Sequence, residues 1–206
     1  MDNIVYKYFT LTENQKRKID SMKSIYAKWN DKVNLISRKD FDNFYEKHVL
    51  HSLSICKIIS FKSGTKIMDL GTGGGFPGVP LAIMHPNVNF HLVDSISKKT
   101  KVLSSIVQEL DLSNVIVLNK RAEDIDDSFD FIVTRAVAKL DQLNLWSKNK
   151  ISSQSNNSIK NGLICLKGGD LSSELAKFNH SVSKYLISDF FKEEFFLNKK
   201  IIHFFN

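Results

Sequence analysis

The sequence has very little cysteine and no long apolar run. Two cysteines, Cys56 and Cys165, are too few for a disulfide framework or an all-cysteine zinc site, so we expect no metal centre. Such sparse cysteine favours a reducing compartment, and we expect a cytoplasmic protein. No stretch reaches the roughly 18 apolar residues of a membrane-spanning helix, and residues 1–20 lack the apolar centre of a signal peptide. We therefore expect no contact with a membrane.

Acidic residues are fewer than basic ones. Lysine and arginine number 29 and aspartate and glutamate 22, which gives a net charge of +7 and an isoelectric point near 9.3. This excess favours a polyanionic partner such as nucleic acid, although a basic protein without such a partner has the same composition. With 206 residues, 42% of them hydrophobic, the chain is long enough for one domain with an extension and is not disordered overall.

Helical spacing of apolar residues dominates the first part of the chain. Thr12 is suited to cap a helix over residues 12–30, in which apolar side chains recur every three or four positions. A similar pattern predicts a second helix over residues 40–59. Residues 1–62 are therefore predicted to form a helical extension.

Short apolar runs alternate with helix-like segments in the remainder, residues 63–206. This alternation predicts a doubly wound α/β domain with a parallel sheet covered on both faces. The aromatic-rich segments 182–191 and 199–205 have no helix-length segment between them and are predicted to pair antiparallel at one edge, giving seven strands. The expected parallel strands are 66–70, 88–93, 114–118, 129–134 and 162–166, and the expected helices are 77–84, 97–110, 138–148 and 171–179.

A glycine-rich segment, residues 69–78, follows the first predicted strand. In such folds ligands bind at the carboxyl ends of the strands, and glycine lets the backbone turn sharply and approach a ligand. The segment fits both the dinucleotide fingerprint and the Asp-x-Gly-x-Gly-x-Gly pattern of S-adenosylmethionine sites. Asp69 favours the second, because a carboxylate repels a pyrophosphate and attracts an ammonium or sulfonium. A tight turn without ligand is the remaining alternative. We expect Asp69, Gly71 and Gly73 to bind the cofactor.

Charged residues follow the next two predicted strands. Asp94 is placed to accept hydrogen bonds from both ribose hydroxyls of an adenosyl group, although it could instead cap the helix over 97–110. Ala122 and Glu123 fall where an adenine ring would lie, and their backbone groups could contact its edge. Alternatively, these residues form a charged loop that is exposed to solvent and binds no ligand.

The expected methyl acceptor follows from what the chain does not contain. Enzymes that methylate adenine or cytosine amino groups often carry a polar-Pro-Pro-aromatic loop after the fourth strand, and this chain has no Pro-Pro. Both cysteines lie in apolar segments and are expected to pack in the interior, which argues against a thiol nucleophile for ring-carbon methylation. A guanine N7 has a free lone pair and needs no general base, so it fits this sequence.

Two basic residues end the fourth and fifth predicted strands. Arg135 could bind or stack on a guanine, or form an ordinary surface ion pair, and Lys167 could hold a phosphate. We expect both to contact the substrate. His48, on the second predicted helix, could touch RNA, but a histidine at such a position is more often structural.

A set of motifs in this order resembles the ribosomal RNA small-subunit methyltransferase G family (RsmG, or GidB). The resemblance covers most of the chain before residue 180 and is most specific in the glycine segment. Position 51 is His where the family usually has Asp, and position 47 is Lys rather than Arg. The matching segments are Trp29-Asn30 with Asn34-Leu35, Lys47–Ser52, Asp69–Pro80, Val93-Asp94-Ser95, Lys98-Lys99, Arg121-Ala122-Glu123, Arg135-Ala136 and Leu166-Lys167-Gly168.

The resemblance implies a class I, Rossmann-like methyltransferase fold with an N-terminal helical extension. It implies N7-methylation of one guanosine in the 530 loop of 16S rRNA, on free RNA or on the 30S subunit, with S-adenosylmethionine as donor. By position, it assigns Gly71, Phe76, Ala122, Glu123 and Arg135 to the cofactor. We expect a monomer. Two alternatives stay open from the residues alone, an NAD(P)-linked oxidoreductase and a non-catalytic RNA-binding protein.

Overall fold

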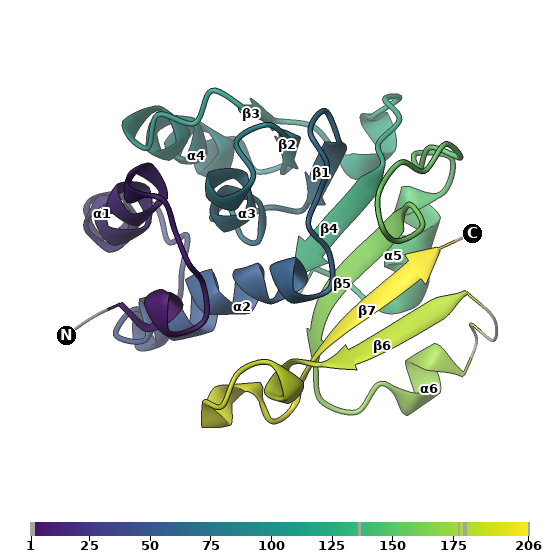
Figure 1. The fold of residues 1–206 in the computed structure, drawn as a ribbon. Helices are drawn as coiled ribbons and strands as arrows, with labels where there is room; N and C mark the ends of the chain where they lie inside the picture. Colours follow the sequence, from purple (N-terminus) through teal and green to yellow (C-terminus); the bar gives the residue numbers. More distant parts are fainter. Residues whose placement is uncertain (1–2, 136, 177, 179–180, 206) are drawn as a thin grey trace.

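One seven-stranded sheet forms the centre of the computed structural model, which describes residues 3–135, 137–176, 178 and 181–205. The strands lie in the order β3-β2-β1-β4-β5-β7-β6 (Figure 1). Their bounds are Lys66–Leu70 (β1), Asn89–Val93 (β2), Val115–Leu118 (β3), Phe131–Arg135 (β4), Gly162–Gly168 (β5), Val182–Leu186 (β6) and Lys199–Phe205 (β7).

The sheet is parallel except at one edge. Strands β1 to β5 pair only in parallel with one another, whereas β7 runs antiparallel to both β5 and β6. The predicted α/β class, the five parallel strands and the antiparallel edge are confirmed. The predicted strand 182–191 is wrong beyond Leu186, because Ile187–Asp189 form a 3-10 turn. Ile187, in this turn, and Phe191, after it, are both fully buried in the core.

The first long helix, α1 (Glu13–Asn30), forms as expected. The Thr12 hydroxyl accepts a hydrogen bond from the Gln15 backbone, and the Gln15 side chain accepts one from the Thr12 backbone, so the pair forms a capping box. The apolar stripe of the helix buries Ile19, Met22 and Tyr26. This stripe packs against helices α3 (Gly78–Met84) and α4 (Ser97–Glu109), and these contacts join the helical extension to the rest of the chain.

The second predicted helix, residues 40–59, is not one regular helix. The chain forms a 3-10 turn at Arg38–Asp40, a π-helical segment at Tyr45–Leu50, one turn of α2 at His51–Leu53 and a further 3-10 turn at Ser54–Lys57. Two neighbouring side chains near the start of this segment are held by other parts of the chain. Phe44 is fully buried in the core, and the Tyr45 hydroxyl donates to the Asp20 carbonyl of α1. These tertiary contacts outweigh the preference of the segment for a regular α-helix.

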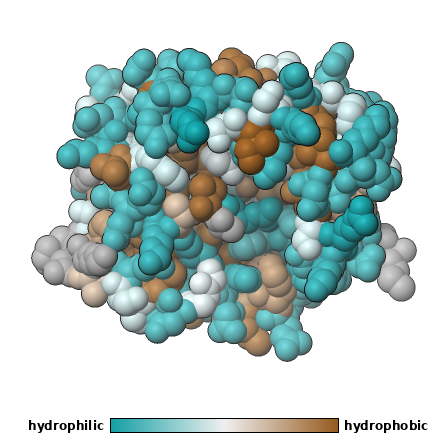
Figure 2. Space-filling model, turned by 180° about the vertical axis from the view of Figure 1, so that it is seen from behind, coloured by the Kyte–Doolittle hydropathy of each residue, from teal (hydrophilic) through white to brown (hydrophobic). Residues whose placement is uncertain are grey.

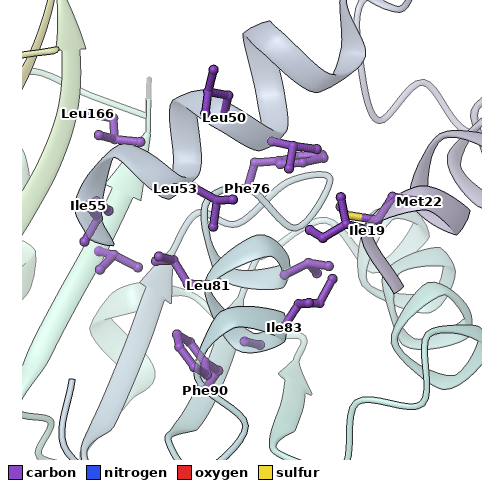
Figure 3. Close-up of a cluster of buried hydrophobic side chains, with 14 of the residues drawn as sticks. Ile19, Met22, Leu50, Leu53, Ile55, Phe76, Leu81, Ile83, Phe90 and Leu166 are labelled. Atoms are coloured by element: carbon purple, nitrogen blue, oxygen red, sulfur yellow. The ribbon is translucent and has the colours of Figure 1, made fainter. Parts of the chain in front are cut away.

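Other helices cover the two faces of the sheet. One hydrophobic cluster contains buried residues of α1, α3 and α4. Figure 3 shows the part of this cluster in which side chains of α1, α3 and residues 50–55 meet those of the strands. A second cluster lies on the opposite face under α5. The predicted helix 171–179 is shortened to α6, and residues 177 and 179 lie outside the described part of the chain. The bounds are Gly78–Met84 (α3), Ser97–Glu109 (α4), Leu140–Ser147 (α5) and Ser172–Leu175 (α6), with 3-10 turns at Ile4–Lys7, Ala122–Asp124 and Glu194–Phe196.

The helical extension shares its core with the sheet domain. Buried residues from Val5 to Phe61 belong to the same hydrophobic cluster as residues of β1, α3 and α4. The division between residues 62 and 63 stays a prediction.

Among the described residues, no helix is long and apolar enough to cross a membrane. The face seen in Figure 2 is mainly hydrophilic, with apolar side chains in small separate groups.

The side chain of Asn114 holds the connection after α3. Its amide nitrogen lies 3.2, 3.1 and 3.0 Å from the carbonyl oxygens of Ala82, His85 and Val88. We predict that Asn114→Ala lowers the free energy of unfolding by about 1 to 2 kcal/mol, because carbonyls at the end of the helix lose their donor. Urea unfolding measures this. Asn89→Ala is the control, since that side chain is exposed; equal effects of the two substitutions would contradict the prediction.

Candidate active site

The glycine segment forms a tight loop where the strand order reverses. It connects β1 to α3, and β1 lies between β2 and β4, which continue the sheet in opposite directions. Gly71, Gly73 and Gly75 have φ angles of 65°, 54° and 89°, which other residues rarely adopt. The loop therefore needs glycine for its shape, and it lies at the position where open α/β sheets bind ligands.

Asp69 is buried beneath this loop. Its Oδ2 accepts hydrogen bonds from the Thr72 hydroxyl at 2.7 Å and from the Gly78 backbone N–H at 2.8 Å. Its Oδ1 is also buried and has no hydrogen-bond partner among the described residues. Burial raises the pKa of Asp69 to about 7, against the hydrogen bonds from Thr72 and Gly78, which lower it. The carboxylate thus ties the loop to α3 and has one buried oxygen without a partner among the described residues.

Asp94 holds the loop from the neighbouring strand. It follows β2, and its Oδ2 accepts a hydrogen bond from the Gly73 N–H at 2.9 Å while its Oδ1 accepts one from the Ile96 N–H at 2.8 Å. The alternative in which Asp94 caps the helix is wrong. The N-cap position of helix α4 is Ile96, and no side chain caps the helix there. The Asp94 carboxylate instead accepts from the N–H of Ile96, two residues on, which forms an Asx-turn before the helix.

A cavity of about 360 Å³ opens beside the loop. Six of the predicted site residues line it together, namely Gly71, Gly73, Asp94, Ala122, Glu123 and Arg135. Asp69, Phe76 and Lys167 do not line this cavity, so their contact with a ligand stays a prediction. Contact of the six with a cofactor stays a prediction too, but the structure does bring them together.

Several lining residues were not predicted as site residues. Ile96 is 48% exposed and Val137 is 37% exposed, and both line the cavity with Trp146. An apolar residue two positions after Asp94 is a signal that could have identified Ile96. Val137 lies close over Gly71, since a Cβ at Gly71 would come within 2.7 Å of it. The cavity thus combines an acidic loop side with apolar walls, as ligand sites commonly do.

Arg135, at the end of β4, makes three contacts with neighbouring residues. Its guanidinium carbon lies 5.0 Å from the centre of the Phe76 ring, one nitrogen donates to the Lys47 carbonyl at 3.3 Å, and another lies 3.1 Å from His48 Nδ1. Burial lowers the pKa of Arg135 to about 10, so it keeps its charge at neutral pH. Phe76 therefore supports Arg135 in this structure. The neighbouring Ala136 of the sequence motif lies outside the described residues.

The two histidines next to Arg135 are neutral. Burial, with Arg135 beside it, lowers the pKa of His48 to about 3. His51 is buried with its ring 5.5 Å from that of Phe195, and burial holds its pKa well below the usual value. A group with so low a pKa is a weak base, so neither histidine is suited to remove a proton from a substrate at neutral pH.

Lys167 and the cysteines complete the predicted set. The Lys167 ammonium donates to the Ala138 carbonyl, in the loop after β4. Cys165 is fully buried in β5, and burial raises the pKa of each cysteine to about 12. Both thiols therefore stay protonated at neutral pH and are poor nucleophiles. The interior packing expected of them is found for Cys165, whereas Cys56 is partly buried against the core.

Comparison with known proteins identifies a family. The model of the GidB family, described as rRNA small subunit methyltransferase G, matches residues 15–200. A ribosomal RNA small subunit methyltransferase G of Bacteroides thetaiotaomicron is 50% identical over 201 residues, 97% of this chain and 98% of that protein. One of Flavobacterium johnsoniae is 47% identical over 203 residues, 98% of this chain and 97% of that protein.

Solved structures share the fold at low sequence identity. A SAM-dependent methyltransferase from Aquifex aeolicus aligns with a TM-score of 0.59 and 14% identity, over 83% of this chain and 100% of that one. A mutant of MtNAS in complex with S-adenosylmethionine aligns with a TM-score of 0.58 and 13% identity, over 92% of this chain and 75% of that one. These likenesses show the fold, which is the methyltransferase fold that the resemblance in sequence implied.

The raised pKa of Asp69 makes stability depend on pH with a defined sign. The folded protein binds a proton below about pH 7, whereas the unfolded carboxyl binds one only near its ordinary value of about 4. We predict that, as the pH falls from 7 to 4, the wild type gains stability relative to Asp69→Asn, at up to about 1.4 kcal/mol per pH unit. Urea unfolding of both proteins across this range tests it, and parallel curves would show that Asp69 does not titrate in this way.

Proposed function

The chain belongs to the rRNA small subunit methyltransferase G family, and we propose that it transfers a methyl group from S-adenosylmethionine to N7 of a guanosine in the 530 loop of 16S rRNA. The observation that carries the proposal is the loop between two carboxylates. Asp69 and Asp94 each accept a hydrogen bond from the glycine loop, and Asp94 lines the adjoining cavity. Family membership supplies the class of substrate.

The loop fits a cationic nucleoside better than a dinucleotide. A pyrophosphate over Gly71 and Gly73 would lie close to Asp94, which lines the cavity and accepts from the Gly73 N–H, whereas the ammonium and sulfonium groups of S-adenosylmethionine are attracted to this carboxylate. The unpartnered Oδ1 of Asp69 is a buried acceptor that such a cation would satisfy. This argument disfavours the NAD(P)-linked alternative.

We propose that the adenosyl group of the cofactor binds beside Asp94, Ala122 and Glu123, which line the cavity. Each Asp94 oxygen that accepts a backbone hydrogen bond has a second lone pair, which a ribose hydroxyl could use. Ala122 and Glu123, in the 3-10 turn after β3, also line the cavity and can present backbone groups to the adenine edge. Ile96 adds an exposed apolar surface beside them, suited to a flat ring.

Methyl transfer to guanine N7 requires that the protein position the guanine, and it requires no general base. When bound, S-adenosylmethionine supplies a methyl group activated by the sulfonium. Guanine N7 has a lone pair in the ring plane and no proton to remove, so the weak basicity of His48, which lies beside Arg135, is compatible with the reaction. Arg135 is held rigidly at the cavity wall, where it can contact the cofactor or bind the guanine edge.

Basic side chains around the cavity fit an RNA substrate. Lys99, Lys120 and Arg121 line it, and the chain has a net charge of +7. Such charges attract the phosphate backbone without reading its sequence. Lys167 is a further candidate for phosphate contact. We propose a cytoplasmic monomer that acts on 16S rRNA, free or within the 30S subunit.

The test is methyl transfer with a chemical readout of position. Purified protein with S-adenosylmethionine is expected to bind the cofactor and to place a methyl group on one guanosine of the 530 loop, detected as 7-methylguanosine by mass spectrometry of RNA fragments. Asp69→Ala and Gly71→Asp are expected to abolish cofactor binding, because the first removes the carboxylate and the second strains a φ of 65° next to Val137. Asp126→Ala, at an exposed position, is the matched control.

Three other outcomes would contradict the proposal. Binding of NAD(P) without S-adenosylmethionine would indicate an oxidoreductase. Salt-dependent RNA binding without cofactor binding would indicate a non-catalytic RNA-binding protein. Methylation at another nucleotide would leave the enzyme class intact and remove the assignment to the 530 loop.

A further inference from the structure

The helical extension contacts the glycine loop directly. The hydroxyl of Tyr26, on α1, donates a hydrogen bond to the Gly74 carbonyl at 2.7 Å. Tyr26 is fully buried, and its ring lies 5.3 Å from the ring of Phe44 and 5.2 Å from that of Phe76. The hydroxyl is therefore held in place by packing rather than by chance contact at a surface.

The bond holds the carbonyl end of a peptide unit whose amide end is bonded within the loop. The peptide between Gly74 and Gly75 has its N–H bonded to the Thr72 carbonyl at 2.8 Å and its C=O bonded to Tyr26. Peptides between glycines rotate at little cost, since no Cβ restricts them. The Gly73 N–H is held by Asp94, which follows β2. Tyr26 and Asp94 thus hold neighbouring parts of the loop from different elements.

A second segment of the extension closes over the same loop. A Cβ on Gly74 would lie 3.1 Å from the Leu35 carbonyl oxygen, so this backbone touches the loop. The side chain of Asn30 holds Leu35 there, because its Oδ1 accepts from the N–H groups of Leu35 and Ile36 and its Nδ2 donates to the Ile36 carbonyl. Asn30 and Tyr26 lie on the same helix, so α1 supports the loop at two points.

We propose that Tyr26 is a positioning residue of the cofactor site, through which the helical extension sets the shape of the loop that receives the cofactor. This inference rests on the proposed function, since it concerns the same loop. Burial raises the pKa of Tyr26, so its hydroxyl stays a donor at any working pH. The extension is then part of the binding site, although none of its residues lines the described cavity beside the loop.

Tyr45 offers a matched control. Its hydroxyl also donates to a backbone carbonyl, that of Asp20 at 2.8 Å, and its ring also packs on Phe44, at 5.4 Å. This bond lies between α1 and the π-helical segment, away from the glycine loop. Tyr26→Phe and Tyr45→Phe therefore each remove one hydroxyl from the extension, and only the first frees the loop.

The experiment compares the two variants with the wild type in the full-length chain. Stability is measured by urea unfolding, cofactor Kd by calorimetric titration with S-adenosylmethionine, and kcat and KM by methyl transfer to 16S rRNA. We expect both variants to lose stability. Only Tyr26→Phe should raise the cofactor Kd and KM, by roughly tenfold, which is about 1.4 kcal/mol, while the KM for RNA stays unchanged.

A second measurement and variant cover the case in which Tyr26→Phe is too unstable to assay. Asn30→Asp keeps the acceptor for Leu35 and Ile36 and loses the donor, so it should raise the cofactor Kd by a smaller factor. Hydrogen exchange at the Gly75 amide should be faster than in the wild type in Tyr26→Phe and in Asn30→Asp, and it should be unchanged in Tyr45→Phe. An unchanged Kd in Tyr26→Phe and Asn30→Asp would overturn the inference, whereas absence of cofactor binding by the wild type would instead overturn the proposed function.

Discussion

The buried carboxylate of Asp69 is the interaction on which the site depends. One of its oxygens accepts hydrogen bonds from Thr72, within the glycine loop, and from Gly78, at the start of α3, so one side chain joins strand, loop and helix. Its other oxygen is buried without a partner among the described residues. A carboxylate in such a place costs free energy, which the raised pKa near 7 expresses. A cation bound in the site would supply the missing partner.

Supports from separate parts of the chain surround that loop. Asp94 reaches it from β2, Tyr26 from the helical extension, and Phe76, at its end, stacks against Arg135 from β4. These contacts join segments that are far apart in the sequence, and they share one hydrophobic cluster. The extension is consequently not an appendage to the sheet. Its buried helix face both completes the core and holds the loop.

Periodicity and glycine content predicted the strands and the loop, because both leave local signals. The alternation of short apolar runs with helical segments was sufficient for the sheet, and the Asp-Gly pattern located the cavity where Gly71, Gly73 and Asp94 meet. Failures arose where distant contacts outweigh local preference. Residues 40–59 show helical spacing, yet Phe44 and Tyr45 are anchored to other elements and distort the helix.

The support from Tyr26 could not be predicted from a local pattern. Its spacing on α1 indicates only a core position, and its hydrogen-bond partner lies 48 residues away. The contacts of the Phe76 ring with Arg135, His48 and Tyr26 likewise left no local signal. The contact of Phe76 with the cofactor, which the resemblance implies, stays a prediction. Such relations depend on how elements pack, and pattern alone does not encode that packing.

The most direct measurement is the number of protons released when S-adenosylmethionine binds at pH 7, obtained by calorimetric titration in buffers of different ionisation enthalpy. If the cofactor's cation faces Asp69, binding should drive that carboxyl fully to its charged form. The wild type should then release about half a proton at pH 7 and almost none at about pH 9, where the carboxyl is already charged, since the pKa of Asp69 lies near 7. The same proton release at both pH values, or no binding at all by the wild type, would contradict the central role given to this buried acid.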